Sequence, residues 1–429
     1  MTPRARIVAA DRRHLWHPYT PIDDAERREP LVIARAEGIR LWDADGRSYL
    51  DANASWWAAL LGHGHPRLVA ALERQARALC HVALAGITHE PAALLAEELA
   101  AVAPPGLGRV FFSDDGSTAV EVAMKLALQY HAQTGAPERV RFLALDGAFH
   151  GDTLGATALG GVELFRRPFA GVLLDCLRVP YGDGAHERAF SALAALLERD
   201  GSEVAAVVLE PVVQGAAGMR VYDAALLAEA RRLCDHYGAL LVADEVFTGY
   251  GRTGPFWACE HSRTTPDLLC TAKGFTGGML PMSATLVAER VYEAFRGGPE
   301  RAFWYGHTYC GNPLGAAIAR EVLAIYRDER VLDRARPKAA RIARAFERLA
   351  GLPGVRATRS LGMVGAAELE GAGYLERSGW RVHDEARARG AYLRPLGNVV
   401  YVTPALNAPD ADLDELLAIV EESIRAALR

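Results

Sequence analysis

Lysine is rare in this sequence, and one lysine has a setting that chemistry explains better than charge does. Among 48 basic residues, lysine occurs only at Lys125, Lys273 and Lys338. Arginine stays protonated in proteins, whereas a buried lysine can lose its proton and attack a carbonyl to form a Schiff base. Lys273 follows the apolar run 268–272 and precedes a glycine-rich turn at 274–278, which lets the backbone approach a ligand. The pattern favours a Schiff-base lysine over the alternative, a surface amine.

A second apolar run, residues 239–243, ends abruptly in Asp244. In open α/β sheets, ligands bind beyond the carboxyl ends of the strands, so Asp244 and Lys273 would meet at one edge. Pyridoxal 5'-phosphate requires such a pair, because a carboxylate keeps its pyridine nitrogen protonated while lysine holds its aldehyde. At about 4 Å and an effective dielectric near 20, the charge pair is worth roughly 4 kcal/mol, or about three pKa units. The alternative for Asp244 is an ordinary capped strand end.

A phosphate-binding turn is predicted near residue 116. The expected strand 109–112 is followed by Gly116, Ser117 and Thr118, and then by a helix at about 119–133. The free amides of a helix N-terminus, together with two hydroxyls, suit a phosphate dianion. The stretch lacks the lysine of a P-loop and the G-x-S-x-G pattern of serine hydrolases. A plain helix cap is the alternative.

Further residues able to do chemistry lie at predicted strand ends and loops. Phe149 follows a strand and could stack on a heteroaromatic ring, and Glu210 ends the next strand. The loop 303–309 combines glycine, hydroxyl and aromatic side chains. Arg394 lies between short strands and precedes a proline, and its forked guanidinium could clamp a carboxylate.

Aromatic residues near the N-terminus allow two interpretations. Residues 11–20 are aromatic and are expected to be irregular, since Pro18 disfavours helix. The tryptophan pair at 56–57 either anchors a domain junction or lines an apolar pocket. His63 and His65 hint at a metal, but no third ligand stands at a useful spacing, so we expect no metal site.

Composition excludes several classes of protein. The 429 residues are 50% hydrophobic with a net charge of −5, which predicts a large core and gives no reason to expect nucleic acid or a membrane surface as a partner. No apolar run reaches the length of about 18 residues that a transmembrane helix needs, and the first residues lack the apolar run of a signal peptide. Six dispersed cysteines indicate reduced thiols, so we expect a cytoplasmic enzyme.

The order of the elements predicts an α/β fold with two domains. Alternating strands and helices over residues 56–328 predict a large domain with a central, mostly parallel sheet and helices on both faces. Residues 329–429 change to helices with short strands. We expect this segment to join residues 1–55 in a small α+β domain.

These motifs, taken in order, resemble the class III aminotransferases of fold type I, and nearly the whole chain takes part. The matching stretches are Asp115-Gly-Ser117, Phe149-His-Gly151, Ala243-Asp-Glu-Val246 with Gly251-Arg-Thr-Gly254, Lys273-Gly274 with Gly277-Gly278, and Thr308-Tyr-Cys-Gly-Asn-Pro313. A subgroup of that family, the diaminopelargonic acid aminotransferases of biotin synthesis, is similar in further stretches: Leu15-Trp-His-Pro-Tyr-Thr20, Ser55-Trp-Trp-Ala58, residues 81–89, residues 117–125 and Arg394-Pro-Leu-Gly397.

The resemblance implies a role for each motif. Lys273 would hold pyridoxal 5'-phosphate and shuttle the proton, and Asp244 would hold the pyridinium. The implied cofactor contacts are Gly116, Ser117, Phe149, Asp244, Lys273, His307 and Thr308, the last reaching across from the partner subunit of a homodimer whose active site lies at the interface. The implied substrate contacts are Tyr19, Trp56, Phe149, Lys273, Gly306, Arg394 and Tyr401, with Arg394 binding the carboxylate of 8-amino-7-oxononanoate.

Two residues depart from the subgroup and leave the amino donor open. Enzymes similar to this one that use S-adenosylmethionine usually have tyrosine where this chain has Phe149 and proline where it has His307. S-adenosylmethionine is the expected donor, since the aromatic stretch 16–19 could hold an adenine; lysine or another ω-amine is the alternative. Two broader alternatives are a general ω-amino acid or polyamine:pyruvate transaminase and a regulator that binds the cofactor without turnover.

Overall fold

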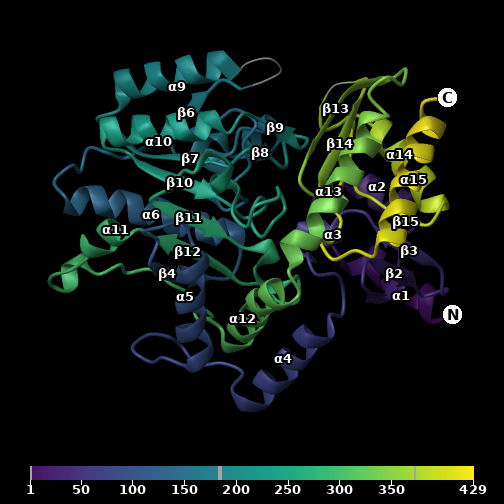
Figure 1. Cartoon of the computed structure of the whole chain (residues 1–429), viewed down its shortest axis with the longest axis horizontal. Helices are drawn as coiled ribbons and strands as arrows, with labels where there is room; N and C mark the ends of the chain where they lie inside the picture. Colours follow the sequence, from purple (N-terminus) through teal and green to yellow (C-terminus); the bar gives the residue numbers. More distant parts are fainter. Residues whose placement is uncertain (1, 182–185, 372) are drawn as a thin grey trace.

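A seven-stranded sheet forms the centre of the larger part of the molecule (Figure 1). The computed structural model describes residues 2–181, 186–371 and 373–429. The sheet has the order β4-β12-β11-β10-β7-β5-β6, and only β12 runs antiparallel to its neighbours. Its strands are β4 (Arg109–Ser113), β5 (Arg141–Leu145), β6 (Cys176–Val179), β7 (Val204–Leu209), β10 (Leu240–Asp244), β11 (Leu268–Thr271) and β12 (Ser283–Val287). The predicted mostly parallel sheet is confirmed.

Helices cover both faces of this sheet. Helix α6 (Gly116–Gln133) packs on one face, against alternate strand residues such as Val208 and Val242. The intervening residues, such as Val207 and Leu241, face the other side. That side carries α5 (Glu90–Val102), α9 (His186–Asp200), α10 (Ala225–Tyr237) and α12 (Pro313–Asp328). Because both faces are buried, every residue of β7 is buried, which explains the continuous apolar runs in the sequence.

The smaller part combines both ends of the chain, as predicted, and both termini lie on its side of the molecule (Figure 1). One sheet has the order β1-β2-β3-β15, in which β15 pairs in parallel with β3, and a second has the order β13-β14-β16. The strands are β1 (Ile33–Glu37), β2 (Arg40–Asp43), β3 (Ser48–Asp51), β13 (Val355–Leu361), β14 (Val364–Leu369), β15 (Ala391–Tyr392) and β16 (Val399–Val402). Its helices are α13 (Val331–Glu347), α14 (Ser378–Ala388) and α15 (Asp410–Ala427). The domain boundaries given above stay a prediction.

The N-terminal stretch is more regular than expected. Helix α1 (Pro3–His14) extends into the stretch 11–20 that was predicted to be irregular. Its N-cap Thr2 accepts a hydrogen bond from the amide of Ala5, and a proline stands at its first position, where proline favours a helix. Pro18 follows the end of α1 and therefore does not interrupt it.

The remaining elements connect these two parts or extend their loops. They include α2 (Ile22–Arg27), α3 (Ala54–Trp57), α4 (Pro66–Ala78), α7 (Leu154–Leu159), α8 (Glu163–Arg166), α11 (Glu289–Glu293) and the hairpin of β8 (Val213–Gln214) with β9 (Arg220–Val221). Over the ranges that the structure describes, no helix is long and apolar enough to cross a membrane. Among the described residues, no group of three or more His, Cys, Asp or Glu side chains is arranged so that it could hold a metal ion.

Asp267 ties three strands of the central sheet together. Its side chain is 7% exposed, and its Oδ2 accepts hydrogen bonds from the amide of Leu241 and from the Arg231 guanidinium, both at 2.8 Å. Its Oδ1 accepts from Arg290 at 2.5 and 3.0 Å, and its backbone carbonyl accepts from the amide of Ala288 at 2.9 Å. These contacts fix where β10, β11 and β12 begin and end relative to one another.

Asp267→Ala is therefore expected to lower the free energy of unfolding by about 3–5 kcal/mol, because it leaves the buried amide of Leu241 without its acceptor and the partly buried Arg231 with only its exposed partner Asp235. Asp235→Ala is the matched control, since Asp235 pairs with the same arginine at 2.6 Å but is 65% exposed, and it should cost less than about 1 kcal/mol. Urea unfolding of both variants measures the difference. Equal losses would contradict the role given to Asp267.

Candidate active site

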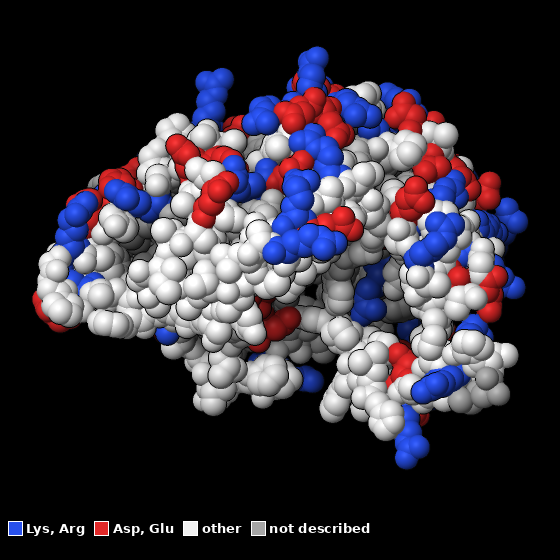
Figure 2. All heavy atoms as spheres, turned by 90° about the horizontal axis from the view of Figure 1, so that it is seen from below, with Lys and Arg blue, Asp and Glu red and all other residues white. Residues whose placement is uncertain are grey.

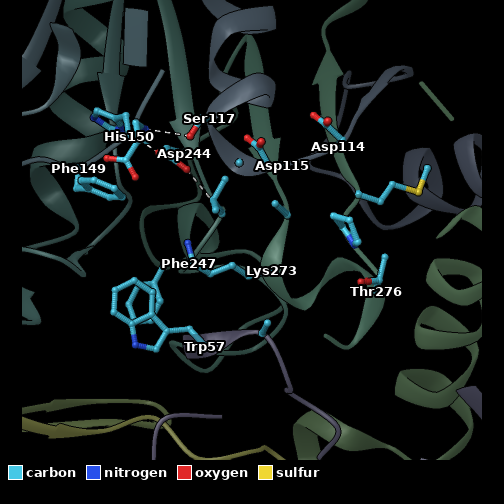
Figure 3. Close-up of a pocket in the computed structure, with 18 of the residues that line it drawn as sticks. Trp57, Asp114, Asp115, Ser117, Phe149, His150, Asp244, Phe247, Lys273 and Thr276 are labelled. Carbon is cyan, nitrogen blue, oxygen red and sulfur yellow. Dashed lines mark hydrogen bonds and ion pairs between the residues drawn. The ribbon is translucent and has the colours of Figure 1, made fainter. Parts of the chain in front are cut away.

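A cavity of about 390 Å³ opens at the carboxyl edge of the central sheet. Lys273, Asp244, Ser117 and Phe149, which lie far apart in the sequence, all line it (Figure 3). Seen from below, the molecule is hollowed between its larger and smaller parts (Figure 2). The structure thus brings together the lysine, carboxylate, hydroxyl and aromatic ring that the sequence placed at strand ends.

Lys273 opens the short 3-10 turn Lys273–Thr276 directly beyond β11. Its backbone lies in the left-handed region at φ 25°, and a Cβ on the next residue, Gly274, would come within 2.3 Å of Leu60 Cδ1. Burial lowers the pKa of the Lys273 amine, although the negative charges of Asp244 and Glu210 oppose that shift. A lowered pKa brings the amine closer to the neutral form that attacks a carbonyl.

Asp244, the last residue of β10, is held by two hydrogen bonds. Its Oδ2 lies 2.7 Å from His150 Nδ1, and its Oδ1 accepts from the amide of Val246 at 3.1 Å. Asp244 is 4% exposed, and the His150 side chain is fully buried. His150 had no predicted role, although it belongs to the Phe149-His-Gly151 motif. Its contact makes it the residue that orients Asp244.

The N-terminus of α6 forms a tight cup beside the lysine. Asp115 caps the helix by accepting from the amide of Thr118 at 2.9 Å, so the amides of the first turn are ordered. A Cβ on Gly116 would lie 2.7 Å from Val246 Cγ1, and one on Gly151 would lie 2.2 Å from Ser117 Oγ. Only glycine fits at these two positions, as expected where a backbone surrounds an anion.

Phe149 and Glu210 are connected through the backbone. Glu210 Oε2 accepts from the amide of Phe149 at 3.1 Å, and its Oε1 accepts from the amide of Gly215 at 3.0 Å. Burial raises the pKa of Glu210 to about 7; His150 opposes that rise, and the negative charge of Asp244 adds to it. Glu210 therefore fixes the loop that carries the Phe149 ring into the cavity.

The residues present fit pyridoxal 5'-phosphate. Lys273 could bind its aldehyde, Asp244 its ring nitrogen, and the α6 cup with Ser117 its phosphate, while Phe149 offers a flat apolar face to its ring. When bound, this cofactor supplies an electron sink for the carbon that loses its proton. The protein supplies the buried amine, the buried carboxylate and a site with little water around them.

The N-terminal arm, residues 15–21 between α1 and α2, reaches the rim of the cavity through Tyr19, while Tyr19 and Arg394 themselves line a second pocket of about 620 Å³. The Tyr19 hydroxyl donates to Asp152 Oδ1 at 2.6 Å, and the Tyr19 carbonyl accepts from the Arg394 guanidinium at 2.7 Å. Burial, with the hydrogen bond to Asp152 adding to it, raises the pKa of Tyr19, so the phenol stays protonated and donates. Arg394 also lies 5.2 Å from the Trp56 ring and 5.6 Å from the Trp380 ring. Among the residues that the structure describes, no carboxylate is within ion-pair distance of Arg394, so its guanidinium can bind an anionic ligand.

Several predicted site residues do not line the cavity in this chain. Tyr401 is 1% exposed and lies behind Trp57, whose indole nitrogen donates to its hydroxyl at 3.1 Å. Trp57, and not Trp56, lines the cavity, and its ring lies 5.2 Å from Lys273 Nζ (Figure 3). Trp56 is 40% exposed and packs on Tyr19 instead.

The loop before α12 also lies outside the cavity of its own chain. Gly306 and Thr308 are exposed there, and His307 Nε2 lies 3.5 Å from Asp114 Oδ1. Within residues 2–181, 186–371 and 373–429, no contact gives Thr308 its predicted role in cofactor binding. Such a role requires a second subunit.

Comparisons with known proteins agree with this geometry. The model of the class-III aminotransferase family matches residues 22–424. A protein from Synechococcus elongatus described as adenosylmethionine-8-amino-7-oxononanoate aminotransferase is 43% identical, covering 95% of this chain and 98% of that protein. One from Nitratidesulfovibrio vulgaris with the same description is 42% identical, covering 98% and 82%.

Solved structures of transaminases are also similar to this chain over nearly its full length. The enzyme of that description from Methanocaldococcus jannaschii superimposes with a TM-score of 0.95 at 33% identity, covering 99% of both chains. An amine transaminase from an uncultivated Pseudomonas species, solved with pyridoxal phosphate bound, gives 0.91 at 31% identity, covering 97% of this chain and 99% of that one. The chain therefore belongs to the class-III aminotransferases, enzymes of fold type I that use pyridoxal 5'-phosphate.

Proposed function

We propose that this enzyme aminates 8-amino-7-oxononanoate to 7,8-diaminononanoate, a step of biotin synthesis. Arg394 carries the proposal: its guanidinium is held by aromatic rings and a carbonyl and is free for the carboxylate of a long oxo acid. An aromatic wall with one distal cation suits such a substrate. The similarity over nearly the full length to relatives that bear this activity in their descriptions supports the assignment.

In this proposal each residue has one task. Lys273 moves the proton to and from the substrate carbon, since its amine lines the cavity and burial lowers its pKa. Asp244, oriented by His150, keeps the ring nitrogen protonated. Gly116 and Ser117 hold the phosphate, and Tyr19 closes the arm over the substrate. The reaction has two halves, in which a donor amine is consumed before the oxo acid is aminated.

The donor is proposed to be S-adenosylmethionine, with lysine as the second candidate. Three carboxylates, of Asp114, Asp115 and Asp152, line the cavity and suit a cationic donor, which both molecules are. Lysine stays a candidate donor because of Phe149. Its ring lacks the hydroxyl of the tyrosine that enzymes using S-adenosylmethionine usually have at this position. His307, which lies 3.5 Å from Asp114 of the cavity, is the second residue that departs from those enzymes, which usually have proline there.

We also propose a homodimer in which Gly306, His307 and Thr308 reach the cavity of the partner subunit. The segments 79–89 and 302–313 contain no Asp, Glu, Lys or Arg, and His89 joins them through a 2.9 Å contact with the carbonyl of Gly311. Ile87, Trp304 and Tyr309 are 54%, 81% and 59% exposed. The connection between α4 and α5 lies on the side that faces the reader in Figure 2, where a broad area lacks charged side chains. An apolar area of this kind beside exposed site residues fits an interface.

We also propose a cytoplasmic location for the enzyme. Its six cysteines are free thiols, as is usual in a reducing compartment.

The donor can be tested by mixing the yellow, cofactor-loaded enzyme with S-adenosylmethionine or with lysine in separate single-turnover experiments. We expect the yellow colour to be lost with S-adenosylmethionine, and 7,8-diaminononanoate to form when 8-amino-7-oxononanoate is then added. Colour loss with lysine alone would assign the second donor. Amination of pyruvate without amination of the oxononanoate would overturn the proposed function.

Arg394→Ala should raise the KM for 8-amino-7-oxononanoate by about 10- to 100-fold, because a charge-assisted contact to its carboxylate is lost. The KM for the donor should change much less, as the donor half-reaction does not need that contact. Arg377→Ala is the control, since Arg377 is a 59% exposed arginine of the same part of the molecule. Equal effects on both substrates would remove the role given to Arg394.

Ile87→Asp should convert the dimer to a monomer and abolish turnover, because it buries a charge in the interface and removes Thr308 of the partner subunit from each site. Val140→Asp, at a 60% exposed valine beside β5, should leave both properties unchanged. Sedimentation velocity and activity measure the two effects. An active monomeric variant would refute the shared site.

A further inference from the structure

Four consecutive residues adopt a left-handed backbone at the point where the small part meets the cavity. Their φ values are 44° at Ala54, 45° at Ser55, 64° at Trp56 and 77° at Trp57. Residues other than glycine avoid this conformation because the Cβ approaches the following carbonyl, and it rarely extends beyond one residue. A run of four needs contacts from outside the turn to hold it.

Asp51, the last residue of β3, supplies those contacts. Its side chain is 2% exposed, and its Oδ2 accepts from the Ser55 amide at 2.7 Å and from the Ser55 hydroxyl at 2.8 Å. The same oxygen lies 3.0 Å from His63 Nε2, and Oδ1 accepts from the amide of Asn53 at 3.2 Å. His63 is itself fixed, because its backbone exchanges two hydrogen bonds with Gly38 at 2.7 and 2.9 Å.

The turn determines where two tryptophans point. Trp57 is directed into the cavity beside the lysine (Figure 3), and its ring lies 4.7 Å from that of Phe247. Trp56, the preceding residue, is directed to Arg394 and Tyr19. Asn53 adds a second link to the arginine, since its Oδ1 accepts from the Arg394 amide at 2.7 Å. A rotation of the turn would therefore displace the surroundings of the lysine and of the arginine at once.

We propose that Asp51, together with His63, is a positioning residue that holds residues 54–57 in their left-handed form and so places both tryptophans. It makes no direct contact with Lys273 or Arg394 and acts through the turn and through Asn53, which precedes the turn. The substrate part of this inference rests on the proposed function, because it takes Arg394 as the site of the oxo acid carboxylate. The part concerning the turn does not depend on any substrate.

Asp51→Asn removes the charge that holds the turn, and Asp43→Asn is its matched control. Asp43 is a second buried carboxylate of the same sheet, 9% exposed, which accepts from the amides of Asp45 and Arg47 and from the Tyr49 hydroxyl at 2.9–3.1 Å. Both substitutions should lower the melting temperature. Only Asp51→Asn should change the near-ultraviolet circular dichroism of the tryptophans in the cofactor-free protein. In the loaded enzyme, only Asp51→Asn should lower kcat/KM for the oxo acid, by about 10- to 100-fold.

A rescue experiment separates backbone positioning from a general loss of stability. Ala54→Gly lets the first strained position adopt φ 44° without a Cβ. Combined with Asp51→Asn, it should restore most of the dichroism and lower the KM for the oxo acid back toward the wild-type value. Combined with Asp43→Asn, it should restore nothing. Ser55→Ala removes the hydroxyl contacts to Asp51 and His63 but keeps the hydrogen bond from the Ser55 amide to Asp51. It should give a weaker form of the same changes and serves if Asp51→Asn does not fold.

The inference would be overturned if Asp51→Asn and Ser55→Ala lost stability with unchanged dichroism and unchanged KM, as expected for Asp43→Asn. It would also be overturned if Ala54→Gly rescued both aspartate variants alike. If the wild-type enzyme did not aminate the oxo acid, the proposed substrate would fail, while the dichroism and the selective rescue would still test the turn.

Discussion

The parallel pairing of β10 with β11 is the constraint on which the site depends. Asp244 stands opposite Cys270 in that register, so the carboxylate and the lysine that follows β11 reach the same edge of the sheet. Asp267 fixes this register from the other end by joining the start of β11 to Leu241 and to two arginines. A shift of one residue would turn Asp244 to the opposite face and separate it from the amine.

Burial then sets the charge state of the groups that the register brings together. It lowers the pKa of Lys273 and raises that of Glu210, so both move toward their neutral forms. Asp244 is 4% exposed and is held by a histidine and a backbone amide. The cavity therefore combines a carboxylate with fixed partners, a second carboxyl group whose pKa is raised to about 7 and an amine whose pKa is lowered.

The sequence predicts the central part of the site well because strand ends and helix caps are local features. The strands that precede Ser117, Phe149, Glu210 and Asp244 were recognisable as apolar runs, and their ends meet because parallel strands share an edge. The choice between Trp56 and Trp57 was not recognisable, since it depends on a left-handed turn held by Asp51 and His63. Tyr401 was placed in the substrate pocket by resemblance, whereas in the structure it supports Trp57 from the core. Its position follows from the pairing of β14 with β16, which no local pattern reveals.

Strand β15 completes the sheet of the small part by pairing Ala391 with Leu50, 341 residues earlier in the chain. During synthesis, β3 emerges from the ribosome long before β15. It therefore stays without this partner while the strands of the central sheet are translated. Contacts of such long range form slowly, because a large loop has to close first. The arm with Tyr19 and the turn with the two tryptophans can therefore reach their final places only after translation is nearly complete. A chain that stalls late would have made the lysine, the acid and the phosphate cup, and would still have no closed substrate site.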